Sequence, residues 1–227
     1  MTPSANSLSV YMDETGGERL KDPGSPFFGV GGCAQLSREF ENSVNVPWRK
    51  LRQEQFPDVE GPLHAVEISK DLPLEKSAAL GTFFRQEKFY RPAVVVIRDT
   101  KKPNEMLEVE CAVLAFAGKI GDLARESGCD EIFLVIEKSD RLQVPYMNAF
   151  SKFRALDESG RAIPLVAGFM DKQLAQPGLE IADFILNAVA PQTRRWISGD
   201  CRLRQDFTAI FDGYPGPMLI KEISPAD

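Results

Sequence analysis

The chain has 227 residues, a length that fits one large domain or two small ones and can bury a core without disulfide or metal crosslinks. Its 27 basic and 33 acidic side chains give a net charge of -6, which excludes a generally basic nucleic-acid-coating protein but not a local basic groove. The single histidine, His64, excludes a zinc site built on several histidines, so any metal chemistry has to rest on carboxylates.

The sequence also indicates the compartment. None of the four cysteines forms a CxxC pair, and their scattered positions are typical of reduced thiols. The N-terminal segment lacks the basic and apolar regions of a signal peptide, and no apolar run approaches the ~20 residues of a membrane-spanning helix. We therefore expect a cytoplasmic protein without a membrane segment.

The first predicted elements are two strands. Apolar and polar residues alternate over 8–13, which predicts a strand that ends at the turn sequence Asp-Glu-Thr-Gly-Gly. Residues 26–35 predict a second strand, joined to the first as an antiparallel hairpin. Its glycines, Gly29, Gly31 and Gly32, indicate bulges or the close approach of another backbone.

Helices are predicted next. Ser37 is expected to cap a helix that runs to about Phe56, with a break near Pro47. A loop over 57–70 contains His64, and Pro73 opens a helix that ends near Phe89.

The rest of the chain alternates strands and helices. Strands are predicted at 93–98, 132–137 and 163–169, with a possible edge strand at 218–223. Helices are predicted from Asn104 to near Gly128, and at 144–157, 178–196 and 206–212. This order predicts one α/β domain with a mixed sheet over 1–227.

Four acidic residues stand out because their neighbours are apolar: Asp13, Glu110, Glu137 and Asp183. Asp13 and Glu137 end predicted strands, where ligands of α/β proteins tend to bind. Either residue is equally compatible with an ordinary turn or a strand end at the surface, and Asp140 is an alternative to Glu137.

Asp183 belongs to a polar line along the last long helix. Glu180, Asp183 and Asn187 are spaced by three and four residues, so they share one face of that helix. The line is either a solvated helix face or one that faces a site beside the sheet.

Convergence of these acids would have a chemical consequence. Carboxylates at close range repel one another unless a cation binds between them, and oxygen ligands favour Mg²⁺ or Mn²⁺ over zinc. Two such ions can activate a water and stabilise the leaving oxygen in phosphodiester cleavage.

Two motifs resemble those of a known family. The sequence Tyr-Met-Asp-Glu-Thr-Gly at 11–16 resembles the opening motif of the domain of unknown function 3800 family. The sequence Gly-Leu-Glu-Ile-Ala-Asp-Phe-Ile at 178–185 resembles its closing motif, in which Gln-x-x-Asp precedes an apolar helix. The chain differs in having Glu180 where the family often has glutamine, which adds a negative charge near the expected site.

The resemblance implies a fold similar to that of ribonuclease H, a mixed five-stranded sheet flanked by helices. Residues 37–91 would then be a helical insertion between the second and third strands. The acids of this pattern match Asp13, Glu110 or Glu108, Glu137 and Asp183, with Glu137 standing where aspartate is more usual. Asp13, Glu137 and Asp183 are the expected Mg²⁺ or Mn²⁺ ligands.

Other charged residues fit a role beside such a site. His64 could shuttle a proton or contact a scissile phosphate with Glu67 nearby, or it could be an ordinary loop histidine. Basic clusters occur at 49–52, 101–102, 194–195 and 202–204. Each could hold phosphates or be a solvated helix end.

The sequence therefore favours a metal-dependent nuclease, a hydrolase with Asp13, Glu137, Asp183, Glu110 and His64 as candidate catalytic residues. The alternatives are a non-catalytic interaction module on the same fold and a phosphatase of small substrates. Nucleic acid is the expected partner, but the sequence does not distinguish DNA from RNA and does not indicate the oligomeric state.

Overall fold

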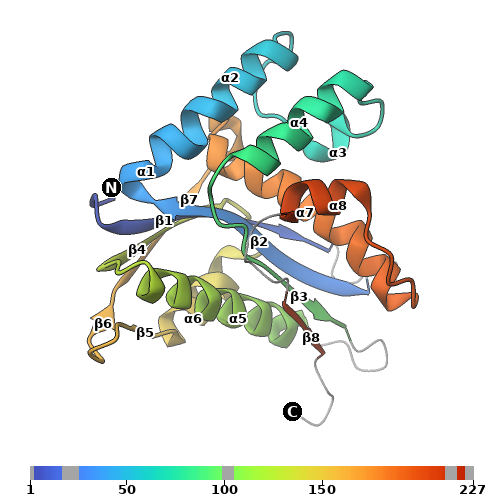
Figure 1. Cartoon of the computed structure of the whole chain (residues 1–227). Coiled ribbons are helices and arrows are strands. Elements are labelled where there is room, and N and C mark those ends of the chain that lie inside the picture. Colours follow the sequence, from blue (N-terminus) through green and yellow to red (C-terminus); the bar gives the residue numbers. More distant parts are fainter. Residues whose placement is uncertain (1–2, 17–25, 99–104, 213–218, 223–227) are drawn as a thin grey trace.

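The computed structural model describes residues 3–16, 26–98, 105–212 and 219–222, and all structural statements concern these ranges. A mixed sheet of six strands has the order β7-β4-β1-β2-β3-β8 (Figure 1). Its strands are β1 (Ser7–Thr15), β2 (Phe27–Leu36), β3 (Ala93–Ile97), β4 (Glu131–Glu137), β7 (Leu165–Met170) and β8 (Leu219–Glu222). A separate small sheet pairs β5 (Ala155–Leu156) with β6 (Ala162–Ile163).

The directions of the strands determine which strand ends meet. Strand β2 is antiparallel to both β1 and β3, whereas β1, β4 and β7 are parallel neighbours. The carboxyl ends of β1, β4 and β7 therefore lie side by side at one edge. The predicted α/β class with a mixed sheet is confirmed, but the sheet has six strands and not the five that the resemblance implies, because the expected edge strand β8 pairs in parallel with β3.

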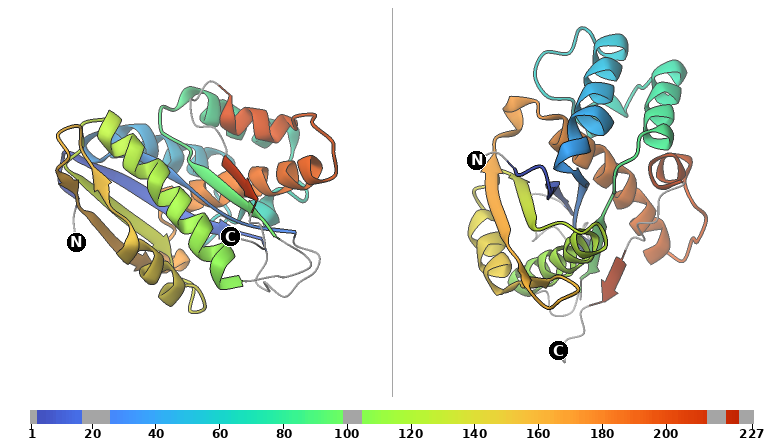
Figure 2. Two further views of the ribbon diagram at one scale, coloured as in Figure 1. Left: turned by 90° about the horizontal axis from the view of Figure 1, so that it is seen from below. Right: turned by 60° about the vertical axis from the view of Figure 1, so that its left-hand side comes forward.

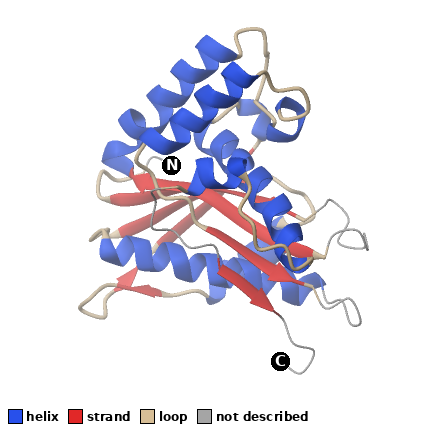
Figure 3. Ribbon diagram, turned by 45° about the vertical axis from the view of Figure 1, so that its right-hand side comes forward, coloured by secondary structure: helices blue, strands red, loops and turns tan. Residues whose placement is uncertain are grey.

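Helices cover both faces of the sheet (Figures 2 and 3). On one face lie α5 (Glu105–Glu126) and α6 (Gln143–Lys152). The other side holds α7 (Pro177–Ile197), α8 (Gln205–Phe211) and the helices between β2 and β3. These last are α1 (Ser37–Phe40), η1 (Glu41–Asn45), α2 (Val46–Gln55), α3 (Ala65–Ile68) and α4 (Leu74–Gln86). A short 3₁₀ turn, η2 (Lys172–Leu174), connects β7 to α7.

The alternation along β1 divides its side chains between two cores. Leu8, Val10 and Met12 are fully buried in the core shared with α5. Tyr11 packs on the core at the opposite face, which contains α7 and the helices between β2 and β3. Asp13 follows the phase of Tyr11, so the sequence pattern correctly sends it to the face on which α7 lies.

Helix α7 packs closely on the sheet because there is a glycine on each side of the contact, Gly31 in β2 and Gly178 in α7. A Cβ atom on Gly31 of β2 would be 2.7 Å from Leu186 Cδ2, and one on Gly178 of α7 would be 2.4 Å from the ring of Tyr11. A side chain at Gly178 would overlap the ring of Tyr11, and one at Gly31 would require Leu186 to shift. The expected close backbone approach occurs at Gly32, where a Cβ atom would be 2.2 Å from the backbone oxygen of Tyr11, and the register of β2 with β1 is continuous, without the alternative bulge.

The helix predicted over 37–56 is continuous but changes its winding before Pro47. A π turn, η1, separates α1 from α2, and Pro47 lies in the first turn of α2, directly after this change of winding. The predicted cap by Ser37 is wrong. Its hydroxyl instead lies 2.6 and 2.7 Å from the hydroxyls of Ser7 and Ser9, which ties α1 to β1.

Other boundaries also differ from the predictions. The helix predicted over 144–157 ends at Lys152, because the chain turns into the β5–β6 hairpin, and the strand predicted over 163–169 is divided between β6 and β7. The loop predicted over 57–70 contains α3. The predicted cap Asn104 lies outside the described residues. All four cysteines are free, and no described helix has the length and apolar character needed to cross a membrane.

Candidate functional site

Two of the predicted acids meet at the carboxyl ends of parallel strands. Met12 of β1 pairs with Ile136 of β4, so the next residues, Asp13 and Glu137, are neighbours at the edge of the sheet. Asp13 is buried, and its Oδ1 accepts a 2.7 Å hydrogen bond from the backbone nitrogen of Glu14. The sheet register alone therefore fixes the spacing of these two carboxylates.

Asp183 reaches the same place from α7. Its Oδ2 accepts a 3.0 Å hydrogen bond from the backbone nitrogen of Ala65, at the start of α3. The imidazole Nδ1 of His64 lies 3.9 Å from the same oxygen, too far for a hydrogen bond. The insertion between β2 and β3 thus orients the carboxylate of Asp183.

A lysine lies among the three carboxylates. The Nζ atom of Lys172, in η2, is 2.9 Å from Glu137 Oε2 and 3.5 Å from both Asp13 Oδ2 and Asp183 Oδ2. Its side chain is 16% exposed, so this ammonium is largely shielded from water. One cationic atom therefore marks the point on which three carboxylates from β1, β4 and α7 converge.

The charged groups lie in a pocket of about 720 Å³. Asp13, Glu137, Asp183 and Lys172 line it, and Asn187 of α7 forms part of its wall. Exposed basic side chains also line it, namely Lys138, Arg141 and Arg194. We call this site the acid pocket: its centre is acidic and its rim carries positive charge.

Burial and the mutual repulsion of the acids change their titration. Burial raises the pKa of Asp13 well above its ordinary value; Lys172 opposes this change, while Glu137 and Asp183 add to it. Burial lowers the pKa of Lys172, but the surrounding carboxylates outweigh burial and raise that pKa above its ordinary value. The ammonium is therefore held in its charged form, and the carboxyl group of Asp13 resists ionisation.

Glu14 points to the other face of the sheet yet also lines the pocket. The hydroxyl of Tyr146, from α6, donates a 3.2 Å hydrogen bond to Glu14 Oε2. Burial, and then the charge of Glu137, raise the pKa of Glu14, and this hydrogen bond opposes the change. Burial and the nearby carboxylate likewise raise the pKa of Tyr146.

The other candidate acids are not brought to the acid pocket. Glu110 does not line it and forms a 2.6 Å ion pair with Lys152 of α6, where the Lys152 side chain is exposed and that of Glu110 is half-buried. Glu108 is buried in a 2.8 Å ion pair with Arg98, just after β3. His64 lies beside Asp183 without lining the pocket, and Asp140 lines it at an exposed position.

The polar line on α7 is not a solvated face. Glu180 is 1% exposed, and its carboxylate accepts 2.6 Å hydrogen bonds from Trp48 Nε1 and the backbone nitrogen of Leu63. The guanidinium of Arg52 pairs with the same carboxylate. Glu180 therefore anchors the insertion to α7, whereas Asp183, almost one turn later, faces the acid pocket.

Sequence reasoning missed Lys172. Met170 pairs with Glu137 in the β4–β7 register, so Lys172 follows directly beyond the end of the strand next to Glu137. A basic residue immediately after a predicted parallel strand was the available signal. In the described residues the carboxylates do not form a ready metal site of three or more His, Cys, Asp or Glu side chains, and the ammonium of Lys172 occupies the space between them.

Comparison with known proteins does not assign this chain to a family. No protein-family model matches the sequence, and no curated protein is significantly similar to it.

Proposed function

We propose that this protein is a Mg²⁺- or Mn²⁺-dependent nuclease with a ribonuclease-H-like fold. The observation that carries the proposal is the convergence of Asp13, Glu137 and Asp183 on one cationic position. The order of elements supports the fold assignment: a hairpin, a helical insertion, a third strand, a long helix and then a strand that ends in an acid. These features agree with the resemblance to the domain of unknown function 3800 family.

The donor set suits a hard divalent cation. Three carboxylates supply the oxygen ligands that Mg²⁺ and Mn²⁺ prefer, and they already surround a positive charge. A metal ion bound there would lower the pKa of a water and stabilise charge on a phosphodiester. Asp13, Glu137 and Asp183 would hold it, provided that the ammonium of Lys172 moves out from between them.

The remaining residues of the acid pocket have roles that need no metal. Lys138 and Arg194 are exposed at its rim, where they can pair with the phosphates of a nucleic acid. The hydrogen bond from the Ala65 backbone holds the carboxylate of Asp183 in one orientation. Because His64 is adjacent to that carboxylate, it is placed to accept or release a proton at the edge of the site.

A second candidate function follows from Lys172 itself. An ammonium that pairs with three carboxylates neutralises much of their charge without any metal, as in a purely structural ion cluster. That observation favours a non-catalytic interaction module on the same fold.

An activity assay with matched variants separates these functions. Purified protein is incubated with single-stranded DNA, double-stranded DNA, RNA and an RNA–DNA hybrid, in Mn²⁺, Mg²⁺ or EDTA. We expect cleavage of at least one substrate with metal and none with EDTA. Asp183→Asn should lose at least about a hundredfold in rate because it removes a charged ligand, whereas Glu110→Gln, the matched control outside the pocket, should retain the activity.

The other outcomes identify the alternatives. Metal binding by calorimetry without cleavage of any nucleic acid would contradict the nuclease and favour a phosphatase of small substrates. Absence of both metal binding and cleavage would favour the interaction module. Equal loss of activity in Asp183→Asn and Glu110→Gln would show that the acid pocket is not the site of the reaction.

A further inference from the structure

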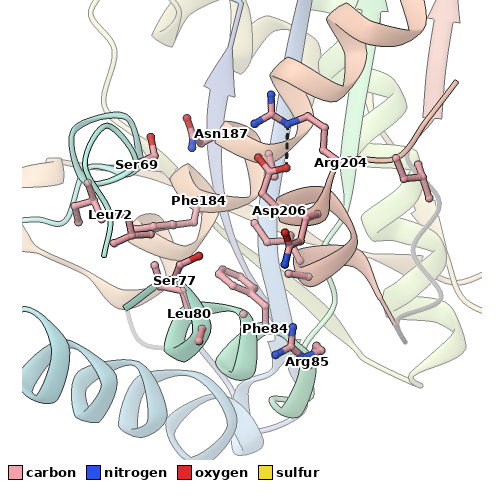
Figure 4. A pocket seen from close by; sticks show the side chains of 18 of the residues that line it. Ser69, Leu72, Ser77, Leu80, Phe84, Arg85, Phe184, Asn187, Arg204 and Asp206 are labelled. Atoms are coloured by element: carbon pink, nitrogen blue, oxygen red, sulfur yellow. Dashed lines mark hydrogen bonds and ion pairs between the residues drawn. The ribbon is translucent and has the colours of Figure 1, made fainter. Parts of the chain in front are cut away.

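A second cavity lies next to the acid pocket, and residues of α3 and α7 line both cavities. It has a volume of about 730 Å³, within the range of small-molecule sites, and its walls come from α4, α7, α8 and the α3–α4 segment (Figure 4). Leu72, Phe84 and Phe184 contribute apolar surface, and Arg85, Arg195 and Arg204 contribute positive charge. We call it the arginine pocket.

The charges of this pocket are unbalanced. Among its lining residues, Asp206 is the one acid against three arginines. Arg204 pairs with Asp206 at 3.0 Å, and Arg195 pairs with Asp200 at 2.9 Å. Within the described ranges, no carboxylate lies within ion-pair distance of Arg85, whose guanidinium makes only a long 3.5 Å contact with the Thr82 hydroxyl. The pocket therefore suits a ligand that carries negative charge.

The wall that carries Arg204 is held in place by a buried side chain. Gln192 of α7 is fully buried; its Nε2 donates a 3.1 Å hydrogen bond to the carbonyl of Arg202, and its Oε1 accepts a 2.9 Å bond from the backbone nitrogen of Arg204. Asp200 in turn pairs with both Arg195 and Arg202. The arginines on this side are thus positioned by the fold and not by solvent.

Apolar side chains are exposed around the same opening. Leu74 is 85% exposed and Leu203 is 56% exposed, and both line the pocket. Exposure of this apolar surface to water is unfavourable, so a ligand that covers the pocket is stabilised by apolar contacts. The pocket combines positive charge with apolar surface, which matches a group that has an anionic part and an apolar part.

The arginine pocket and the acid pocket are neighbours that share one lining residue. Asn187 lines both cavities. On α7, the consecutive residues Asp183 and Phe184 line one cavity each, and on α3 Val66 lines the acid pocket while Ile68 lines the arginine pocket. A chain-like ligand that crosses Asn187 would therefore contact both cavities.

We propose that the arginine pocket binds one nucleotide of a single-stranded nucleic acid whose neighbouring phosphate reaches the acid pocket. The base lies against the leucines and the edge of Phe184, and the phosphate of that nucleotide faces Arg85. A single strand is required because the base has to be unpaired to enter a cavity. This inference rests on the proposed nuclease function and identifies its substrate class.

Binding measured without catalysis tests the inference. A fluorescent single-stranded oligonucleotide, as DNA and as RNA, is titrated with the full chain in EDTA and followed by anisotropy. Arg85→Ala should weaken binding about five-fold and reduce the slope of log affinity against log salt by about 0.7, the value for one phosphate contact on a single strand. Arg125→Ala, an equal charge change on α5 across the sheet, should change neither quantity.

A second pair of variants tests the cavity itself without changing charge. Ser77 is exposed and lines the pocket, so Ser77→Trp should fill it and weaken single-strand binding several-fold while leaving the salt slope unchanged. Ser151→Trp, at an exposed position on α6 across the sheet, is the matched control and should bind as the wild type does.

The outcomes separate this inference from the nuclease proposal. If wild type binds no single strand, or if both pocket variants bind as tightly as their controls, the inference is overturned even if the protein cleaves duplexes. If the pocket variants lose binding but wild type cleaves nothing, the inference stands and the nuclease proposal fails. Binding of a free mononucleotide but of no oligonucleotide would also overturn it.

Discussion

Two carboxylates of α7, less than one turn apart, have opposite surroundings. Glu180 accepts hydrogen bonds from Trp48, Arg52 and Leu63, so each of its two oxygens has at least one donor. Asp183 shares the ammonium of Lys172 with Asp13 and Glu137. The first region has one acid with several donors, and the second has several acids with one cation.

This difference indicates which carboxylate is structural. Donors that point at Glu180 come from α2 and from the segment before α3, so its charge joins the insertion to α7. Burial raises the pKa of Asp13 well above its ordinary value and the neighbouring carboxylates add to that rise, while the one ammonium of Lys172 opposes it. Three carboxylates that share one ammonium can still gain from another cation, whereas Glu180 already has the guanidinium of Arg52 to itself.

The largest expected effect is on the free energy of unfolding, when Glu180 no longer anchors the insertion to α7. Glu180→Gln places an amide N–H₂ among groups that are all donors and leaves Arg52 without its carboxylate, so we expect a loss of about 3 kcal/mol in the free energy of unfolding. Urea denaturation measures it. Glu110→Gln, which removes a partly exposed ion pair, is the matched control and should cost less than about 0.5 kcal/mol. Equal losses in the two variants would refute the anchoring role of Glu180.

A smaller effect is expected at the centre of the acid pocket. Lys172→Met removes the ammonium from between the carboxylates and should lower the free energy of unfolding in EDTA by about 2 kcal/mol. Adding Mg²⁺ or Mn²⁺ should then stabilise the variant more than the wild type, because the cation no longer competes with Lys172. Thermal melts with and without metal measure both effects. A loss that metal does not reduce would argue against a shared position for ammonium and metal.

The smallest expected effect is on the pH dependence of the free energy of unfolding. Because the pKa of Asp13 is raised above its reference value of 3.8 in the folded state, the native state binds the extra proton. The contribution of protonated Asp13 to the free energy of unfolding is fully present below pH 3.8, the reference value, and is lost as pH rises through the pKa of the folded state. In EDTA, Asp13→Asn should remove this decline and change the slope of stability against pH by at most about 1.4 kcal/mol per pH unit. Denaturation curves from pH 4 to pH 7 measure it; an unchanged slope would contradict the shift.

Local patterns predicted the central elements well. The alternation over 8–13 identifies β1 and the face to which Asp13 points, and the apolar run before Glu137 identifies β4. Boundaries were less accurate where tertiary contacts compete with local preference. Ser37 has the residue type of a helix cap, but the hydroxyls of Ser7 and Ser9 on β1 are its partners instead.

The sequence by itself determined the α/β class, the acids at two strand ends and the shared helix face of Glu180 and Asp183. Periodicity can do this because it specifies how a side chain points relative to its own strand or helix. Only the tertiary structure decided that Lys172 lies among the three carboxylates, that Glu180 is an anchor, and that Glu110 pairs with Lys152 instead. Those outcomes depend on contacts between distant segments, and the spacing within one element carries no information about which segments meet.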